Sequence, residues 1–86
     1  MFVILTYDMN QKRVSKMLKI CRKYLLHVQK SVFEGVITEA KLRLLQSEIK
    51  KVINVNEDMV CIYCMESAKY AHKEQIGIVK NISNII

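Results

Sequence analysis

The chain opens with an almost wholly apolar segment, Phe2 to Tyr7, which ends at Asp8. Its residues are mainly β-branched or aromatic and do not alternate with polar ones, so the pattern predicts a central strand buried on both faces. A helix containing Lys12 and Arg13 is expected directly afterwards. A carboxylate at such a junction suggests a metal site that handles phosphate. Because Mg²⁺ needs several oxygen ligands, we expect the second carboxylate to come from Asp8 of another copy.

The rest of the chain divides by its hydrophobic period. Asn10 is a suitable N-cap for a helix over about residues 11–25, and Thr38 for a second helix over about 39–53, because apolar residues recur at helical spacing after each. A second strand is expected at 28–33, with a turn at Glu34-Gly35. Residues 59–65 predict a third strand that is apolar on both faces. Residues 76–79 predict a short fourth.

Four strands and two helices predict a ferredoxin-like α+β sandwich, βαββαβ, over residues 1–80. Two helices can cover only one face of such a sheet, yet strands one and three carry apolar side chains on both. A second protomer that packs sheet to sheet about a twofold axis would cover the other face, so we expect a homodimer. Residues 81–86 form a tail containing Ile82, Ile85 and Ile86, which we expect to add an edge strand.

Length and composition exclude several classes of protein. With 86 residues the chain has room for one small domain. The apolar run at its start is far shorter than the roughly 20 residues that span a bilayer, and no export signal precedes it, so we expect a cytoplasmic protein. Cys21, Cys61 and Cys64 are then expected as reduced thiols. Cys61 and Cys64 are three apart on a predicted strand and would point to opposite faces, which argues against zinc.

The distribution of charge suggests a polyanionic partner. The formal charge is +6, and residues 9–33 contain seven Lys or Arg and no Asp or Glu. On the predicted first helix Lys12, Lys16, Lys19 and Lys23 share one face, and together with Arg13 they are the candidate residues for binding nucleic acid. Such a face can follow a phosphate backbone, or it can be an ordinary solvated surface. We favour nucleic acid, without base-specific recognition, because no acidic residue balances the charge and no recognition motif appears.

Alternatives remain for the individual candidate residues. Asp8 is either one half of a metal site or a cap that starts a turn or the first helix. His27 and His72 are single histidines, better explained by packing or surface positions than by catalysis. Tyr7 and Ser31 can donate hydrogen bonds to a phosphate, although strand residues of these types are usually structural. Phe33 is most simply a core or interface residue.

Several of these residues together resemble the CRISPR-associated protein two family. The resemblance covers about residues 2–80, and its most specific parts are Tyr7-Asp8 and the stretch VQKSVFEG at 28–35. Arg13 matches a basic position early in the first helix, and Ser31 and Phe33 match the SVF motif. His27 departs from the pattern, since relatives often carry Arg or an aromatic residue there. The resemblance therefore assigns no substrate contact to His27, and the role of this residue stays open.

The resemblance implies a ferredoxin-like homodimer whose C-terminal segment joins the partner's sheet. It also implies the small subunit of the spacer-acquisition complex, which bridges two dimers of the CRISPR-associated integrase, protein one. Some relatives are metal-dependent endonucleases on single-stranded RNA or duplex DNA, and Asp8 of both protomers would then bind Mg²⁺, or Mn²⁺ in its place. A non-catalytic scaffold, a ribonuclease toxin of the virulence-associated type and a small-ligand regulatory domain are the alternatives.

Overall fold

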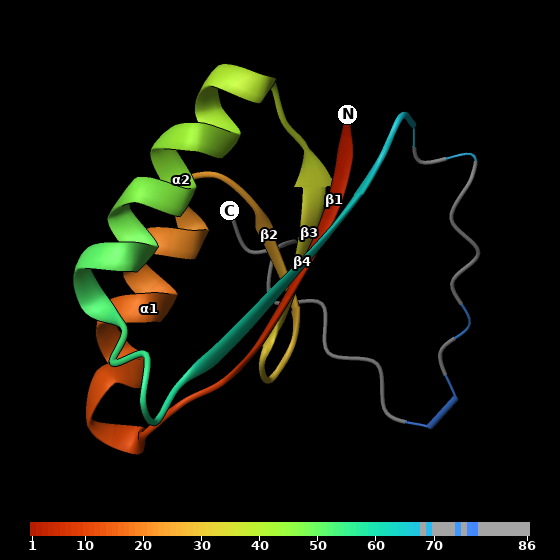
Figure 1. The fold of residues 1–86 in the computed structure, drawn as a ribbon. Helices are drawn as coiled ribbons and strands as arrows, with labels where there is room; N and C mark the ends of the chain where they lie inside the picture. Colours follow the sequence, from red (N-terminus) through yellow and green to blue (C-terminus); the bar gives the residue numbers. More distant parts are fainter. Residues whose placement is uncertain (68, 70–73, 75, 78–86) are drawn as a thin grey trace.

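Helices and strands alternate as βαββαβ in the computed structural model, which describes residues 1–67, 69, 74, 76 and 77 (Figure 1). The elements in chain order are the strand β1 (Phe2–Asp8), the helix α1 (Gln11–Arg22), the strands β2 (Leu26–Gln29) and β3 (Val32–Val36), the helix α2 (Glu39–Val52) and the strand β4 (Met59–Met65). The strand expected at 59–65 is thus confirmed. The strand expected at the start of the chain is also confirmed, with Asp8 as its last residue.

One sheet contains all four strands in the order β2-β3-β1-β4, and each neighbouring pair is antiparallel. The strand β1 lies between β3 and β4, so the expectation of an inner first strand is confirmed. Both helices pack side by side on one face of this sheet (Figure 1). This arrangement confirms the ferredoxin-like α+β fold.

The core lies between the sheet and the two helices. Along β1, Val3, Leu5 and Tyr7 are buried toward the helices, while the residues between them are only half-buried. The helices contribute Met17, Cys21 and Leu45, and β3 contributes Phe33, all fully buried. Each such apolar side chain stabilises the fold by about 1.5–3 kcal/mol relative to an exposed position. The sheet and helices therefore share one apolar interior.

The expected second strand and its turn were wrong. Residues 26–36 form a β2–β3 hairpin whose turn is at Lys30 and Ser31, and Glu34-Gly35 lies inside β3. Gly35 packs closely on Leu25: a Cβ there would lie 3.3 Å from Leu25 Cδ2, so that side chain would have to shift by a few tenths of an ångström. A glycine that permits close approach has the same sequence signature as a turn glycine.

The helices begin where the capping residues predict. The Asn10 side chain accepts a hydrogen bond from the Lys12 amide at 3.1 Å, and the Thr38 hydroxyl accepts one from the Lys41 amide at 3.2 Å. The first helix ends at Arg22, three residues earlier than expected. No helix in the described part of the chain is long and apolar enough to cross a membrane.

Two expectations concern the C-terminal region. Of the short strand expected at 76–79, the described residues Ile76 and Gly77 are not in a strand, and residues 78 and 79 lie outside the described residues. The tail at 81–86 and its proposed edge strand also lie outside them. His72 also lies outside the described residues.

The other side of the sheet, which we call the helix-free face, is covered by no helix of the described chain. Residues directly opposite each other in an antiparallel pair point to the same side, so Ile4, Glu34 and Tyr63 share this face. By the same register the face also includes Phe2, Thr6, Asp8, Leu26, Val32, Val36, Met59, Cys61 and Met65. Apolar side chains predominate among them, and Val36 is 75% exposed, Met59 59% and Tyr63 55%.

Candidate active site and nucleic-acid surface

Asp8 occupies the last position of β1, opposite Met59 of β4, and is exposed. It follows Tyr7, whose side chain points toward the helices, so the Asp8 side chain belongs to the helix-free face. Asn10, not Asp8, caps α1, so the interpretation of Asp8 as the cap of the first helix is wrong. Among the described residues the Asp8 carboxylate has no hydrogen-bond or ion-pair partner. Its oxygens are therefore available to an external ligand.

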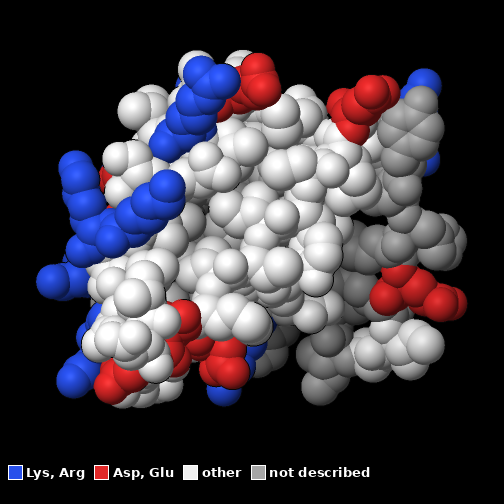
Figure 2. Space-filling view, viewed as in Figure 1, with Lys and Arg blue, Asp and Glu red and all other residues white. Residues whose placement is uncertain are grey.

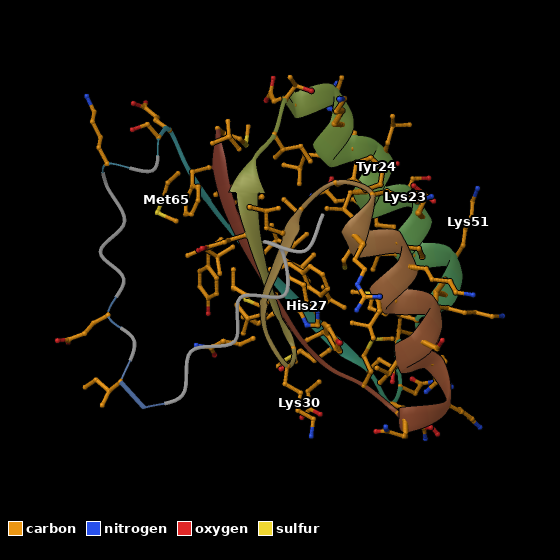
Figure 3. All side chains as sticks on the ribbon, turned by 180° about the vertical axis from the view of Figure 1, so that it is seen from behind. Lys23, Tyr24, His27, Lys30, Lys51 and Met65 are labelled. Atoms are coloured by element: carbon orange, nitrogen blue, oxygen red, sulfur yellow. The ribbon has the colours of Figure 1, made fainter. Side chains whose placement is uncertain are left out.

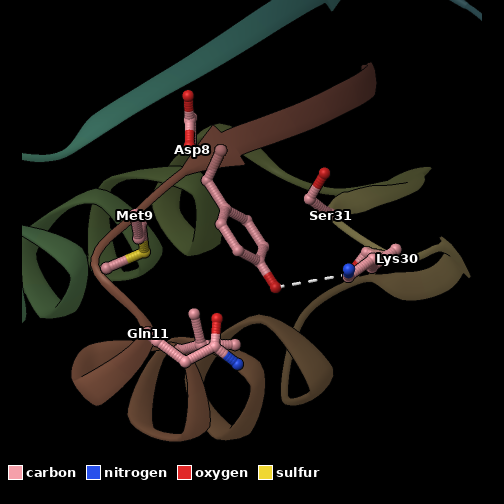
Figure 4. Close-up of a pocket in the computed structure, with 7 residues that line it drawn as sticks. Asp8, Met9, Gln11, Lys30 and Ser31 are labelled. Carbon is pink, nitrogen blue, oxygen red and sulfur yellow. Dashed lines mark hydrogen bonds between the residues drawn. The ribbon is translucent and has the colours of Figure 1, made fainter.

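A cavity of about 310 Å³ adjoins Asp8, between the end of β1, the start of α1 and the β2–β3 turn (Figure 4). Its lining consists of Tyr7, Asp8, Met9, Gln11, Val14, Lys30 and Ser31. This volume lies at the lower end of the range found for small-molecule sites. Gln11 and Ser31 supply neutral polar groups and Lys30 a cation, which suit a phosphate group, while the Asp8 carboxylate lies at the margin and is directed to the helix-free face.

Hydrogen bonds join the walls of this cavity. The Tyr7 hydroxyl donates to the Lys30 carbonyl at 3.4 Å, and the Tyr7 amide donates to the Ser31 carbonyl at 3.2 Å. Burial raises the pKa of Tyr7, so its hydroxyl stays protonated and acts as a donor near neutral pH. The β2–β3 turn is thus held against the end of β1. Gln11 and Lys30 were not assigned to a site from the sequence; Lys30 belonged to the basic run, and Gln11 carried no signal.

Phe33, the third residue of the SVF motif, does not line the cavity. Its ring is fully buried and stacks on the ring of His27, with centroids 4.4 Å apart and an interplanar angle of 11°. Nε2 of His27 lies 3.2 Å from the Lys30 carbonyl and must carry a proton to donate to it. Nδ1 of His27 is buried and has no partner among the described residues. Phe33 and His27 therefore support the hairpin from inside, which confirms the core interpretation of Phe33 and the packing interpretation of His27.

The basic face of α1 is smaller than its sequence suggests. Lys12, Lys16 and Lys19 are exposed. The Arg13 guanidinium donates from Nε to Asp58 Oδ2 at 2.6 Å and from Nη2 to Glu57 at 2.5 Å, so its charge is already compensated. Lys23 is paired with Glu48 of α2. Two of the five cations predicted to bind nucleic acid are thus engaged within the chain.

Asp58 joins the loop after β1 to the loop after α2. Besides Arg13, its carboxylate accepts hydrogen bonds from the backbone amides of Asn10 at 2.9 Å and Asn54 at 2.8 Å, and its side chain is inaccessible to solvent. The hydrogen bonds from Arg13, with the two amides, hold the pKa of Asp58 well below its usual range. Since Asn10 is two residues from Asp8, this network fixes the backbone next to the candidate site.

The described residues of one chain do not form a complete metal site. They contain no group of three His, Cys, Asp or Glu side chains that could hold an ion. Cys61 lies opposite Thr6 and Cys64 opposite Val3, so the two thiols point to opposite faces, as expected. Asp8 alone offers one exposed carboxylate. It suits a hard cation only if further oxygen ligands come from a second chain, from water or from substrate.

The molecule is therefore a small ferredoxin-like domain with a carboxylate at a strand end, a cavity beside it and cationic helices behind it. Comparison with known proteins identifies the family of this chain. The family model for CRISPR associated protein Cas2 matches residues 1–73. The chain belongs to the Cas2 family of CRISPR-associated proteins.

Individual relatives are similar over almost their whole length. A protein from Dictyoglomus turgidum, named CRISPR-associated endoribonuclease Cas2, is 49% identical over 94% of this chain and 93% of its own. A protein of the same name from Thermotoga maritima is 44% identical, and the match covers 100% of this chain and 99% of that protein. Among solved structures, one of Cas2 has a TM-score of 0.86 at 35% identity, covering 93% of this chain and 90% of that chain. The structure of Streptococcus pyogenes Cas2 has a TM-score of 0.79 at 28% identity, and the match covers 90% of this chain and 100% of that chain.

Proposed function

We propose that this protein acts in CRISPR adaptation as a homodimer that binds nucleic acid and carries a metal-dependent endonuclease centre at Asp8. One observation carries the proposal: Asp8 is exposed and unpartnered among the described residues, at the margin of an apolar sheet face that a second copy can cover. The names of the relatives from Dictyoglomus turgidum and Thermotoga maritima, CRISPR-associated endoribonuclease Cas2, support it.

The helix-free face supports the homodimer. Its exposed side chains Val36, Met59 and Tyr63 lie on β3 and β4, and Ile4 of β1 lies between these strands. A soluble monomer seldom leaves such a contiguous apolar surface exposed. A second copy packed sheet to sheet about a twofold axis would bury the same patch twice. In this dimer residues 81–86 would add an edge strand to the partner's sheet.

The dimer would also complete the metal site. Asp8 of each protomer would supply one carboxylate to a shared Mg²⁺, or Mn²⁺ in its place, with water and the substrate phosphate as further ligands. When bound, such an ion would polarise the phosphodiester and lower the pKa of a water. The residues beside Asp8 would place the substrate. The Lys30 ammonium would bind a phosphate, and the Ser31 hydroxyl and the Gln11 amide would donate hydrogen bonds to the backbone or a base.

Single-stranded RNA and duplex DNA are the proposed substrates. Lys12, Lys16 and Lys19 on α1 would bind phosphates, while Arg13 and Lys23 would act through the contacts that hold the helix in place. The partner in adaptation would be the CRISPR-associated integrase, protein one. The dimer would bridge two dimers of this integrase. We place this activity in the cytoplasm. The family assignment favours this function over a stand-alone toxin.

The decisive experiment compares wild type with Asp8→Asn, and uses Glu39→Gln as the control. Glu39 is an exposed carboxylate in the first turn of α2, so its loss changes the net charge equally without touching the site. After each protein is verified as a dimer, cleavage of single-stranded RNA and duplex DNA is measured with Mg²⁺, Mn²⁺ or EDTA. Binding to uncut duplex is measured in parallel.

We expect metal-dependent cleavage by wild type and Glu39→Gln, and none by Asp8→Asn, whose DNA binding persists. This result would assign the reaction to Asp8 because the two variants carry the same charge. If no protein cleaves while salt-sensitive DNA binding persists, the endonuclease proposal is wrong. The protein would then be a non-catalytic scaffold for the integrase.

A further inference from the structure

The cavity beside Asp8 has two walls of different chemistry. On the β2–β3 turn, the Lys30 ammonium and the Ser31 hydroxyl have no partner among the described residues. On α1, Gln11 and Val14 are three residues apart and therefore lie on the same side of the helix. The Gln11 amide is also unpartnered within the described part of the chain. One wall thus offers a cation and a hydroxyl, and the other offers an amide next to an aliphatic side chain.

Apolar groups from the end of β1 complete the lining. Met9 directly follows the strand, and Tyr7 is buried near its end. The Tyr7 hydroxyl donates to the Lys30 carbonyl, the hydrogen bond drawn in Figure 4, so it is not available to a ligand. Tyr7 therefore offers the cavity mainly its ring. The lining is apolar near β1 and α1 and polar near the turn.

The charge of the cavity suits a phosphodiester better than a phosphate ion. Lys30 is the only cation among the residues that line it, and Figure 3 shows Lys30 on the hairpin while Lys23 and Lys51 lie on the side of the helices. The Asp8 carboxylate at the margin would repel a ligand with two negative charges. A phosphodiester carries one negative charge, which the Lys30 ammonium can compensate.

A nucleotide base fits the rest of the lining. A free phosphate would lose hydration against Met9 and Val14, which cannot replace those hydrogen bonds. A base can bury its ring against such side chains, and the donors and acceptors on its edge match the Gln11 amide, which both donates and accepts. The volume of about 310 Å³ lies at the lower end of the range for small ligands, so it suits one base with its sugar better than a longer segment.

We propose that this cavity takes up the base of one unpaired nucleotide of a single-stranded RNA. Gln11 would contact the edge of the base, Val14 would contact its ring, and Lys30 would bind its phosphate. The proposal rests on the proposed endonuclease function and deepens it, because it explains how the site would select single strands. In a duplex the edge of each base is paired and its faces are stacked, so the base cannot enter a cavity unless it first leaves the helix.

Binding of a duplex should not depend on the cavity. On the face seen in Figure 2, Lys and Arg side chains gather over the helices. Lys12, Lys16 and Lys19 of α1 are exposed, and none of them lines the cavity. A duplex backbone can therefore contact these lysines while every base stays in the stack. Changes inside the cavity should affect single strands and duplexes differently.

Equilibrium binding of strands with and without bases tests the proposal. Fluorescence anisotropy is measured in EDTA, to prevent cleavage, with a labelled single-stranded RNA, a ribose-phosphate strand of equal length without bases, and a duplex DNA of the same sequence. Gln11→Leu removes the amide without lowering helix propensity, and Gln46→Leu on α2 is the matched control outside the cavity. Val14→Phe, which would fill the cavity, is a second variant. Circular dichroism confirms that all four proteins are folded.

Wild type and Gln46→Leu should bind the RNA about tenfold more tightly than the strand without bases. Gln11→Leu and Val14→Phe should lose about tenfold in affinity for the RNA, while their affinity for the other two ligands changes by less than about twofold. Unchanged RNA binding in both variants, an equal loss for all three ligands, or equal binding of RNA and the strand without bases by wild type would overturn the proposal. If wild type binds none of the three ligands, the proposed nucleic-acid function itself is wrong.

Discussion

Arg13 and Asp58, 45 residues apart in the chain, form a two-pronged contact in which the guanidinium donates through both Nε and Nη2 to the two carboxylate oxygens. Such paired hydrogen bonds are stronger and more specific in direction than a single one. The same carboxylate holds the Asn10 amide, so the contact links the helix start, the loop after α2 and the backbone beside Asp8. Arg13 therefore positions the candidate site rather than presenting a free charge to nucleic acid.

This contact predicts a specific loss of stability in acid. The folded-state pKa of Asp58 lies below the unfolded value of about 3.9, so the unfolded chain takes up a proton first as the pH falls. The stabilisation is complete above about pH 4 and is lost progressively below it. Asp58→Asn should therefore lose less of its unfolding free energy than wild type between pH 5 and pH 3, as measured by urea denaturation. Glu39→Gln should behave like wild type, and identical pH profiles for all three proteins would contradict the assignment.

Charges on the helix-free face should dissociate the proposed dimer. Lysine at Tyr63 would place a charge inside an apolar interface, which is costly when nothing pairs with it. Tyr63→Lys should raise the dimer dissociation constant about 100-fold or more in sedimentation velocity experiments. Leu44→Lys is the matched control, because Leu44 is similarly exposed but lies on α2. Dissociation by Leu44→Lys, or its absence in Tyr63→Lys, would place the interface elsewhere.

Phe33 and Ser31 belong to the same motif but should differ in effect. Phe33→Leu removes the ring that stacks on His27 in the core and should lower the free energy of unfolding by about 1–2 kcal/mol. Cleavage per folded molecule should change little. Ser31→Ala removes a group that lines the cavity and should alter unfolding by less than about 0.5 kcal/mol while weakening substrate binding. Urea denaturation and cleavage kinetics are measured on both variants. A loss of stability in Ser31→Ala, or weaker substrate binding in Phe33→Leu, would contradict the prediction.

The three thiols should react at very different rates. Burial raises the pKa of Cys21 to about 12, so its thiolate, the reactive form, is scarce at pH 8. Cys64 is exposed, and Cys61 lies on the face that the dimer would cover. A disulfide reagent should therefore modify Cys64 first and Cys21 only after unfolding in guanidinium chloride. Cys64→Ser should remove the fast phase, and its persistence would show that another thiol is accessible.

Local patterns were sufficient for much of the fold. The strand before Asp8, the caps Asn10 and Thr38 and the strand at 59–65 were all predicted, because each depends on the period or the side-chain chemistry of adjacent residues. The hairpin at 26–36 was not. Lys30 and Ser31 lack a strong turn signature, and Gly35 suggested a turn although it lies inside β3, packed against Leu25.

The residues of the candidate site were likewise predicted only in part from local patterns. Asp8, Tyr7 and Ser31 were found from their strand-end and motif positions, and the structure brings them to one cavity. Gln11 joins them through the start of α1, which no local pattern signals. The basic helix was evident in the sequence, yet the partners of Arg13 and Lys23 lie more than 20 residues away, so their pairing could not be predicted.

The sequence by itself determined the element types, the ferredoxin-like class, the position of Asp8 and the excess of positive charge, because these follow from residues close together in the chain. The tertiary structure alone decided which cations remain available, which residues line the cavity beside Asp8, and that Phe33 supports the site from within. These features depend on contacts between distant segments. The free energy of such contacts is set by packing and burial, which the order of residues does not display.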